Sequence, residues 1–185
     1  MFVLNIAQDL TLKQLEYGEA SELFNLIQSC RSYLRHWLKW IDTLRTAQDV
    51  EHFIHRASME TMNGRSLQAG IRSRGELAGL ISYDFMDWEN RSTNIGAWLG
   101  DHFQGKGIIS RATWAMTEYA FQQMKLNRVE IRCGLHNAKS RAVPERLGFR
   151  EEGVVHEAEW LHHRFIDHVI YGMTKKDYLA LTGQP

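Results

Sequence analysis

The spacing of hydrophobic residues predicts helices in the first third of the chain. Leu23, Leu26 and Ile27 recur at the spacing of one helix face between Ser21 and Cys30. Further helices are expected around Leu34 to Ile41 and from Thr46 to Asn63, and later in the chain over Ala112 to Met124, Ser140 to Leu147 and Lys176 to Leu181. The N-terminal part is therefore expected to be mainly helical.

From residue 66 onward the hydrophobic period changes to two, which is typical of strands. Ser66 to Arg72 alternates, Arg74 to Glu76 predicts a turn, and Leu77 to Trp88 continues as a hairpin partner. Other strands are expected near Leu10 to Leu15 and over Thr93 to Leu99, Val129 to Leu135, Phe149 to Trp160 and Phe165 to Thr174.

The order of these elements predicts an α/β arrangement with an antiparallel start. One parallel crossover is expected, from the strand Thr93 to Leu99 through the long helix to the strand Val129 to Leu135. The loop between that first strand and the helix, Gln104 to Arg111, then lies at the carboxyl end of its strand. Ligands of open α/β sheets bind at such ends.

Length and composition predict a single domain over residues 1–185. Lys plus Arg and Asp plus Glu both number 22, so the charge balance gives no case for binding nucleic acid or an anionic membrane. The N-terminus is a poor signal peptide, and no apolar run approaches the ~20 residues of a membrane-spanning helix. The isolated Cys30 and Cys133 suit a reducing interior, where both are expected as small core residues. A cytoplasmic protein is expected.

The loop Gln104 to Arg111 carries the first chemical signal. Its two glycines precede a helix, where free N–H groups and the helix dipole favour a phosphate. A P-loop requires its lysine after the second glycine, whereas Lys106 lies between Gly105 and Gly107. A dinucleotide fingerprint requires a third glycine where Ser110 stands.

Two blocks resemble the GNAT N-acetyltransferases. Gln104, Gly107 and Ile109 occupy the family's acyl-coenzyme A loop motif, although Ile109 replaces a small residue. The second block runs from Asn137 through Ser140 to the Leu-Gly-Phe sequence at residues 147–149. The segments at 34–40, 152–153 and 158–160 are similar to the RimJ/RimL-type branch, which acetylates N-terminal amines of ribosomal proteins.

The resemblance implies a single-domain GNAT-type fold of the α/β (α+β) class. Such a fold has a mixed, mostly antiparallel sheet of about seven strands, flanked by helices and splayed at the central parallel strand pair. It also implies acetyl-CoA as co-substrate. The residues expected to bind it are Ala97, Trp98, Leu99, Gln104, Gly105, Lys106, Gly107, Ile108, Ile109, Ser110, Asn137, Lys139 and Ser140.

The resemblance further implies direct attack of an amine on the thioester. A backbone amide of Trp98 or Leu99 would polarise the acetyl carbonyl. Ser140 would donate a proton to the departing thiolate, although it is also suited to cap a helix. Glu159 is the expected general base; Glu157, on the same face if the strand alternates regularly, is the alternative.

The acceptor site is expected to be aromatic. Trp37, Trp40, Tyr83 and Trp160 are its predicted substrate-binding residues. No metal is expected, because the nine histidines lack complete zinc-ligand spacing.

Three functions follow from these features. The first is acetyl transfer to a protein N-terminal amine, and the second is transfer to a small amine such as a polyamine or an amine antibiotic. The third is a non-catalytic acyl-CoA-binding regulatory domain. A homo-oligomer is also expected, because aromatic residues are frequent in the last strands and the sheet has an exposed edge.

Overall fold

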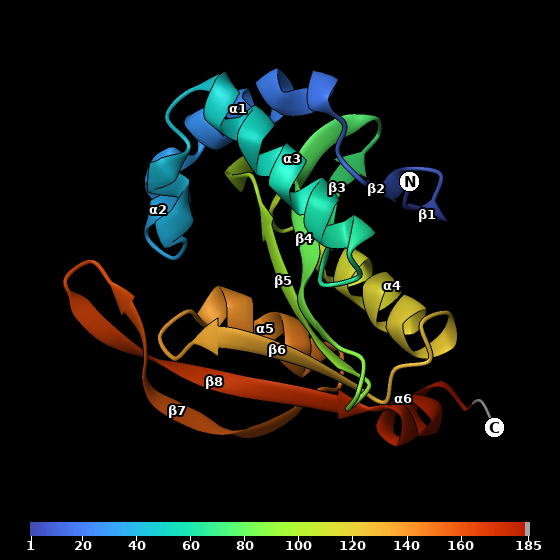
Figure 1. The fold of residues 1–185 in the computed structure, drawn as a ribbon. Coiled ribbons are helices and arrows are strands. Elements are labelled where there is room, and N and C mark those ends of the chain that lie inside the picture. The colour runs from blue at the N-terminus through green and yellow to red at the C-terminus, as the bar shows by residue number, and fades with distance from the viewer. Residues whose placement is uncertain (184–185) are drawn as a thin grey trace.

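One mixed sheet organises the chain in the computed structural model, which describes residues 1–183 (Figure 1). The last two residues of the predicted domain lie outside the described residues. The eight strands are ordered β1-β2-β3-β4-β5-β6-β8-β7. Their bounds are β1 Val3–Ala7, β2 Leu10–Lys13, β3 Leu67–Ser73, β4 Glu76–Asp87, β5 Ser92–Leu99, β6 Arg128–Gly134, β7 Arg150–Leu161 and β8 Arg164–Thr174.

Helices cover both faces of this sheet. They are α1 Ala20–Ser29, α2 Arg31–Arg35, α3 Ala47–Met62, α4 Ile108–Gln122, α5 Ala138–Arg146 and α6 Lys175–Thr182. Two hydrophobic clusters result. Ile81, Met116 and Phe121 belong to the cluster under α4, whereas Leu23 and Ile54 belong to the cluster under α1 and α3. None of the described helices is long and apolar enough to cross a bilayer.

The parallel pair β5 and β6 separates soon after it forms. The two strands pair from Ser92 with Arg128 to Asn94 with Glu130, whereas β5 continues to Leu99 and β6 to Gly134. Figure 1 shows the consequence: β1 to β5 form one wing of a V, and β6, β8 and β7 form the other. The predicted mixed sheet, splayed at its central parallel pair, is confirmed.

Several elements differ from the sequence-based expectations. Where one helix was expected around Leu34 to Ile41, α2 ends at Arg35 and a separate 3-10 turn spans Lys39–Thr43. The sheet has one strand more than the expected seven, because Val3–Ala7 pairs with β2 and lays Leu4 and Ile6 against the core. The long helix begins at Ile108 rather than Ala112, since Gly107 supplies a left-handed residue immediately before it. The helix α5 begins at Ala138 rather than Ser140.

Candidate active site

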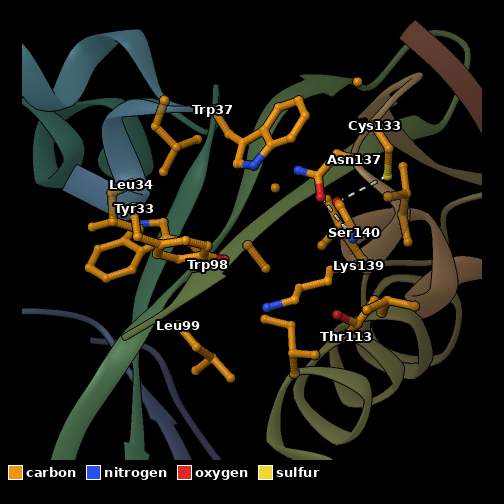
Figure 2. Close-up of a pocket in the computed structure, with 18 of the residues that line it drawn as sticks. Tyr33, Leu34, Trp37, Trp98, Leu99, Thr113, Cys133, Asn137, Lys139 and Ser140 are labelled. Atoms are coloured by element: carbon orange, nitrogen blue, oxygen red, sulfur yellow. Dashed lines mark hydrogen bonds between the residues drawn. The ribbon is translucent and has the colours of Figure 1, made fainter. Parts of the chain in front are cut away.

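A large cleft lies where the two wings separate. Its volume is about 2010 Å³. Typical small-molecule sites are ~300–1,000 Å³, so this cleft has room for more than one ligand. Trp37, Trp98 and Ser140 face it from the N-terminal region, β5 and α5 respectively (Figure 2). The tip of the β7–β8 hairpin reaches the N-terminal region, because His162 Nε2 lies 2.7 Å from the carbonyl oxygen of Arg35.

The glycine loop forms one end of this cleft. Gly105 and Gly107 have φ values of 72° and 73°, which favour glycine. Gly107 is the N-cap of α4, and no side chain caps this helix. The backbone bond from the Arg111 N–H to the Gly107 carbonyl closes the first turn. The preceding N–H groups therefore point out of the helix, as in anion sites.

One buried side-chain donor in the cleft wall, Trp98 Nε1, lacks a hydrogen-bond partner among the described residues. Buried donors are nearly always paired in folded proteins, so a wall with such a donor fits a ligand that carries acceptors. The acceptor-rich pyrophosphate and pantetheine amides of coenzyme A meet that requirement chemically.

The basic side chains around the glycine loop have different partners, and not all of them line the cleft. Arg146 donates to Ser110 Oγ at 2.9 Å, and both residues line the cleft together with Lys139. Arg111 is paired with Asp9. Lys106 does not line the cleft, and its Nζ lies 5.9 Å from the centre of the Phe103 ring.

Ala97, Trp98 and Leu99 line the cleft along β5. They pair with β4 on one side. On the other side the ladder with β6 has already ended at Asn94. Backbone groups on that edge of β5 are therefore available to a ligand inserted between the wings.

Asn137 and Ser140 have distinct roles at the start of α5. Asn137 is the N-cap, and its Oδ1 accepts from the Ser140 backbone N–H at 3.1 Å. The Ser140 hydroxyl is consequently not the cap, which removes that alternative. It lies 3.2 Å from Cys133 Sγ instead, as the dashed line in Figure 2 shows. Burial raises the pKa of the Cys133 thiol, which keeps it protonated.

Glu159 lies in the cleft, and Glu157 does not line it. The regular alternation expected for this strand is wrong, because β7 shifts register between Val155 and Glu159. Glu157 has a φ of 51° within that bulge. Glu159 Oε2 lies 3.1 Å from His168 Nε2, and both residues line the cleft.

The predicted aromatic acceptor site is only partly assembled. Trp37 and Trp40 line the cleft. Trp40 stacks on Phe53 with a centroid distance of 5.2 Å. Trp37 reaches across to the end of β6, since a Cβ added at Gly134 would lie 3.1 Å from its ring.

Tyr83 and Trp160 do not line the cleft. The prediction of Tyr83 as a substrate-binding residue is wrong, whereas that of Trp160 stays a prediction. Tyr83 is completely buried on the α4 side of β4, where its hydroxyl donates to the Met116 carbonyl. Burial raises the pKa of Tyr83 well above its usual value. Trp160 is 45% exposed and packs edge-to-face on Phe165 in the β7–β8 hairpin.

Among the cleft residues that were not assigned to the site from the sequence are Tyr33, Asp84, Arg146 and His168. No local motif marks Tyr33, Asp84 or His168, because each becomes part of the cleft only through the packing of distant elements. Within residues 1–183, no group of three or more His, Cys, Asp or Glu side chains is arranged to hold a metal ion.

Comparison with known proteins gives the family. The model of the acetyltransferase (GNAT) domain matches residues 9–150. The chain is 35% identical over 181 residues to the "Putative ribosomal N-acetyltransferase YdaF" of Bacillus subtilis, covering 96% of this chain and 98% of that protein. It is 29% identical over 168 residues to the "Ribosomal-protein-serine acetyltransferase" of Escherichia coli, covering 91% and 94%.

A solved structure agrees with these relatives. The microcin C7 self-immunity acetyltransferase MccE, in complex with acetyl-CoA and AMP, superposes with a TM-score of 0.88 at 29% identity, covering 91% of this chain and 94% of that one. The chain therefore belongs to the GNAT acetyltransferase family. The resemblance predicted from the two sequence blocks is confirmed, including its similarity to the ribosomal-protein branch.

Proposed function

We propose that this protein transfers the acetyl group of acetyl-CoA to the N-terminal amine of a ribosomal protein. The observation that carries this proposal is the cleft between β5 and β6, with an uncapped helix N-terminus at one end and unpaired strand backbone along its wall. The names of the YdaF and E. coli relatives support the acceptor class. The acetyl-CoA of the MccE structure supports the donor.

Acetyl-CoA would be bound at three places in the cleft. The N–H groups from Gly105 to Ser110 would bind the pyrophosphate, aided by Arg146. The free edge of β5 at Ala97 to Leu99 would pair with the pantetheine amides. Asn137 would add its side-chain amide, and the thioester sulfur would lie near Ser140.

The reaction requires two proton transfers. The acceptor ammonium first loses a proton to Glu159, and the free amine attacks the thioester carbonyl. The tetrahedral intermediate then expels the thiolate, which takes a proton through Ser140 while the nitrogen loses its second one. The products are the amide, coenzyme A and one proton released to solvent.

Direct transfer is favoured over an acetyl-enzyme. Cys133 is 3% exposed, and burial raises the pKa of its thiol. A thiol, unlike a thiolate, is a poor nucleophile. Cys30 is likewise buried, with a raised thiol pKa.

An acetyl-CoA turnover assay tests the proposal. Release of coenzyme A is followed with N-terminal peptides and small amines in parallel. Turnover with the peptides supports the proposed acceptor, whereas turnover only with polyamines or amine antibiotics would replace it. Tight coenzyme A binding without transfer to any amine would indicate the regulatory domain instead.

We also infer a cytoplasmic, homo-oligomeric protein that forms one domain over residues 1–185. The oligomer is supported by β7, an edge strand that leaves Val154 and Val155 exposed. Light scattering after size-exclusion chromatography measures the oligomeric state, and a monomer at micromolar concentration would contradict this inference.

The Gly107→Ala variant tests the loop. An L-residue in the left-handed region costs about 1–2 kcal/mol, which the loop relieves by moving its N–H groups away from the pyrophosphate. We expect coenzyme A binding, measured by calorimetry, to weaken about tenfold. Gly75→Ala is a matched control, because Gly75 also has positive φ and open space but lies in the β3–β4 turn. Equal affinity in both variants would contradict the assignment.

A further inference from the structure

Five carboxylates line the cleft: Asp42, Asp49, Asp84, Asp101 and Glu159. Four of them have a basic partner or cap a helix. Asp42, Asp101 and Glu159 lie against Arg35, His102 and His168 respectively, and Asp49 forms a capping box with Thr46. Asp84 has neither a basic partner nor a capping role.

Asp84 is held by neutral donors alone. Its carboxylate accepts from Ser82 Oγ, and from Asn94 Nδ2 at 3.0 Å. Within residues 1–183, no Lys, Arg or His forms an ion pair with it. Burial therefore raises the pKa of the Asp84 carboxyl above its usual value, while the two hydrogen bonds oppose that shift. A carboxylate in such surroundings gains from a bound cation.

The side chain of Asp84 faces the cleft from β4. β4 and β5 shift register between Tyr83 and Phe85, so Asp84 is the extra residue of a β-bulge. Bulges redirect single side chains and are frequent beside active sites. Asp84 lies on the face opposite the buried Tyr83, as alternation along β4 requires, and its side chain lines the cleft.

Gly96 brings the carboxylate close to the reacting end of the donor. A Cβ on Gly96 would lie only 2.6 Å from Asp84 Oδ2, so the carboxylate rests directly over the β5 backbone. Gly96 precedes Ala97 and Trp98, the segment assigned above to the pantetheine arm and the acetyl carbonyl. With acetyl-CoA bound as proposed, the negative charge would lie beside the thioester.

We propose that Asp84 binds the ammonium group of the acceptor and holds its nitrogen beside the thioester. This inference rests on the proposed function and gives Asp84 a role distinct from that of Glu159. Glu159 removes the proton, whereas Asp84 recognises the positive charge and positions the amine. The site therefore selects acceptors that arrive protonated and rejects a blocked N-terminus, which has no charge to pair with Asp84.

The test measures recognition separately from turnover. Calorimetry compares a serine-initiated hexapeptide with a free amine against the same peptide with an acetylated N-terminus, each added to protein saturated with coenzyme A. Wild type is expected to prefer the free amine by about tenfold or more, the value of a charge-assisted hydrogen bond. Asp84→Asn should lose this preference, and in turnover its KM should rise by a similar factor with little change in kcat.

Glu76→Gln is the matched control, because Glu76 is exposed at the start of the same strand. It should retain the preference. If Asp84 only stabilises the bulge, Asp84→Asn will lower the melting temperature and keep the preference, which would overturn the inference. Absence of a free-amine preference in wild type would also overturn it. Binding with this preference but without turnover would overturn the proposed function alone.

Discussion

Glu159→Gln is expected to lower kcat by about a hundredfold or more, since a general base contributes ~10²–10⁴-fold. The amide cannot accept the ammonium proton, but it still fits beside His168 at the position of the 3.1 Å contact. The fold and coenzyme A binding should therefore be preserved. Steady-state rates across the neutral pH range, with melting temperature and coenzyme affinity measured in parallel, check this expectation.

Glu157→Gln is the matched control for this variant. Glu157 lies two positions away on β7 and outside the cleft, and the contact of this residue with Asp167 uses its backbone N–H. Its substitution should leave kcat unchanged. A large loss in Glu157→Gln with normal turnover in Glu159→Gln would reverse the assignment of the base.

Ser140→Ala is expected to lower kcat by about a hundredfold, because the departing thiolate loses its proton donor. The hydroxyl lies in the cleft, and its observed partner is Cys133 Sγ at 3.2 Å. The helix cap comes from Asn137, so α5 should keep its start. The rate is measured with acetyl-CoA and with an acetyl donor whose thiol has a lower pKa.

A thiolate whose thiol has a lower pKa leaves more readily without being protonated. The acetyl donor that carries such a thiol should therefore restore much of the turnover that Ser140→Ala loses with acetyl-CoA. Cys133→Ser separates direct transfer from an acetyl-enzyme. It should keep its turnover, since attack by the amine requires no thiol. Loss of turnover in Cys133→Ser, with normal turnover in Ser140→Ala, would contradict the mechanism.

Much of the fold could be predicted from the sequence, because its signals are local. Alternation and helical spacing locate most strands and helices, although the long helix expected from Ala112 begins at Ile108, directly after Gly107. The strand Val3–Ala7 was missed, since a short edge strand has only Leu4 and Ile6 half-buried and gives a weak pattern.

The acceptor side of the cleft could be predicted less well, because a bulge in β7 changes which side chains face it. Regular alternation placed Glu157 with Glu159, and the bulge in β7 separates them. In β4, Tyr83 points into the core and Asp84 faces the cleft, and the bulge that follows Tyr83 leaves Phe85 exposed as well. A bulge depends on pairing with the neighbouring strand, which periodicity along one segment does not record.

The position of the glycine loop Gln104 to Arg111 in the fold was easier to predict, since one strand, one loop and one helix create it. The sequence alone did not decide whether Asn137 or Ser140 caps α5, because both side chains are equally suited to that role. The structure gives it to Asn137 and leaves the Ser140 hydroxyl facing the cleft. His168 had no such signal, because it meets Glu159 only through the pairing of β7 with β8.

The most direct test of the central claim is mass spectrometry of peptides incubated with the protein and acetyl-CoA. The account predicts a gain of one acetyl group, which fragmentation assigns to the N-terminal amine. The rate should fall sharply in Glu159→Gln and stay unchanged in Glu157→Gln. Acetylation of lysine side chains alone, or of small amines with the peptides left unmodified, would contradict it.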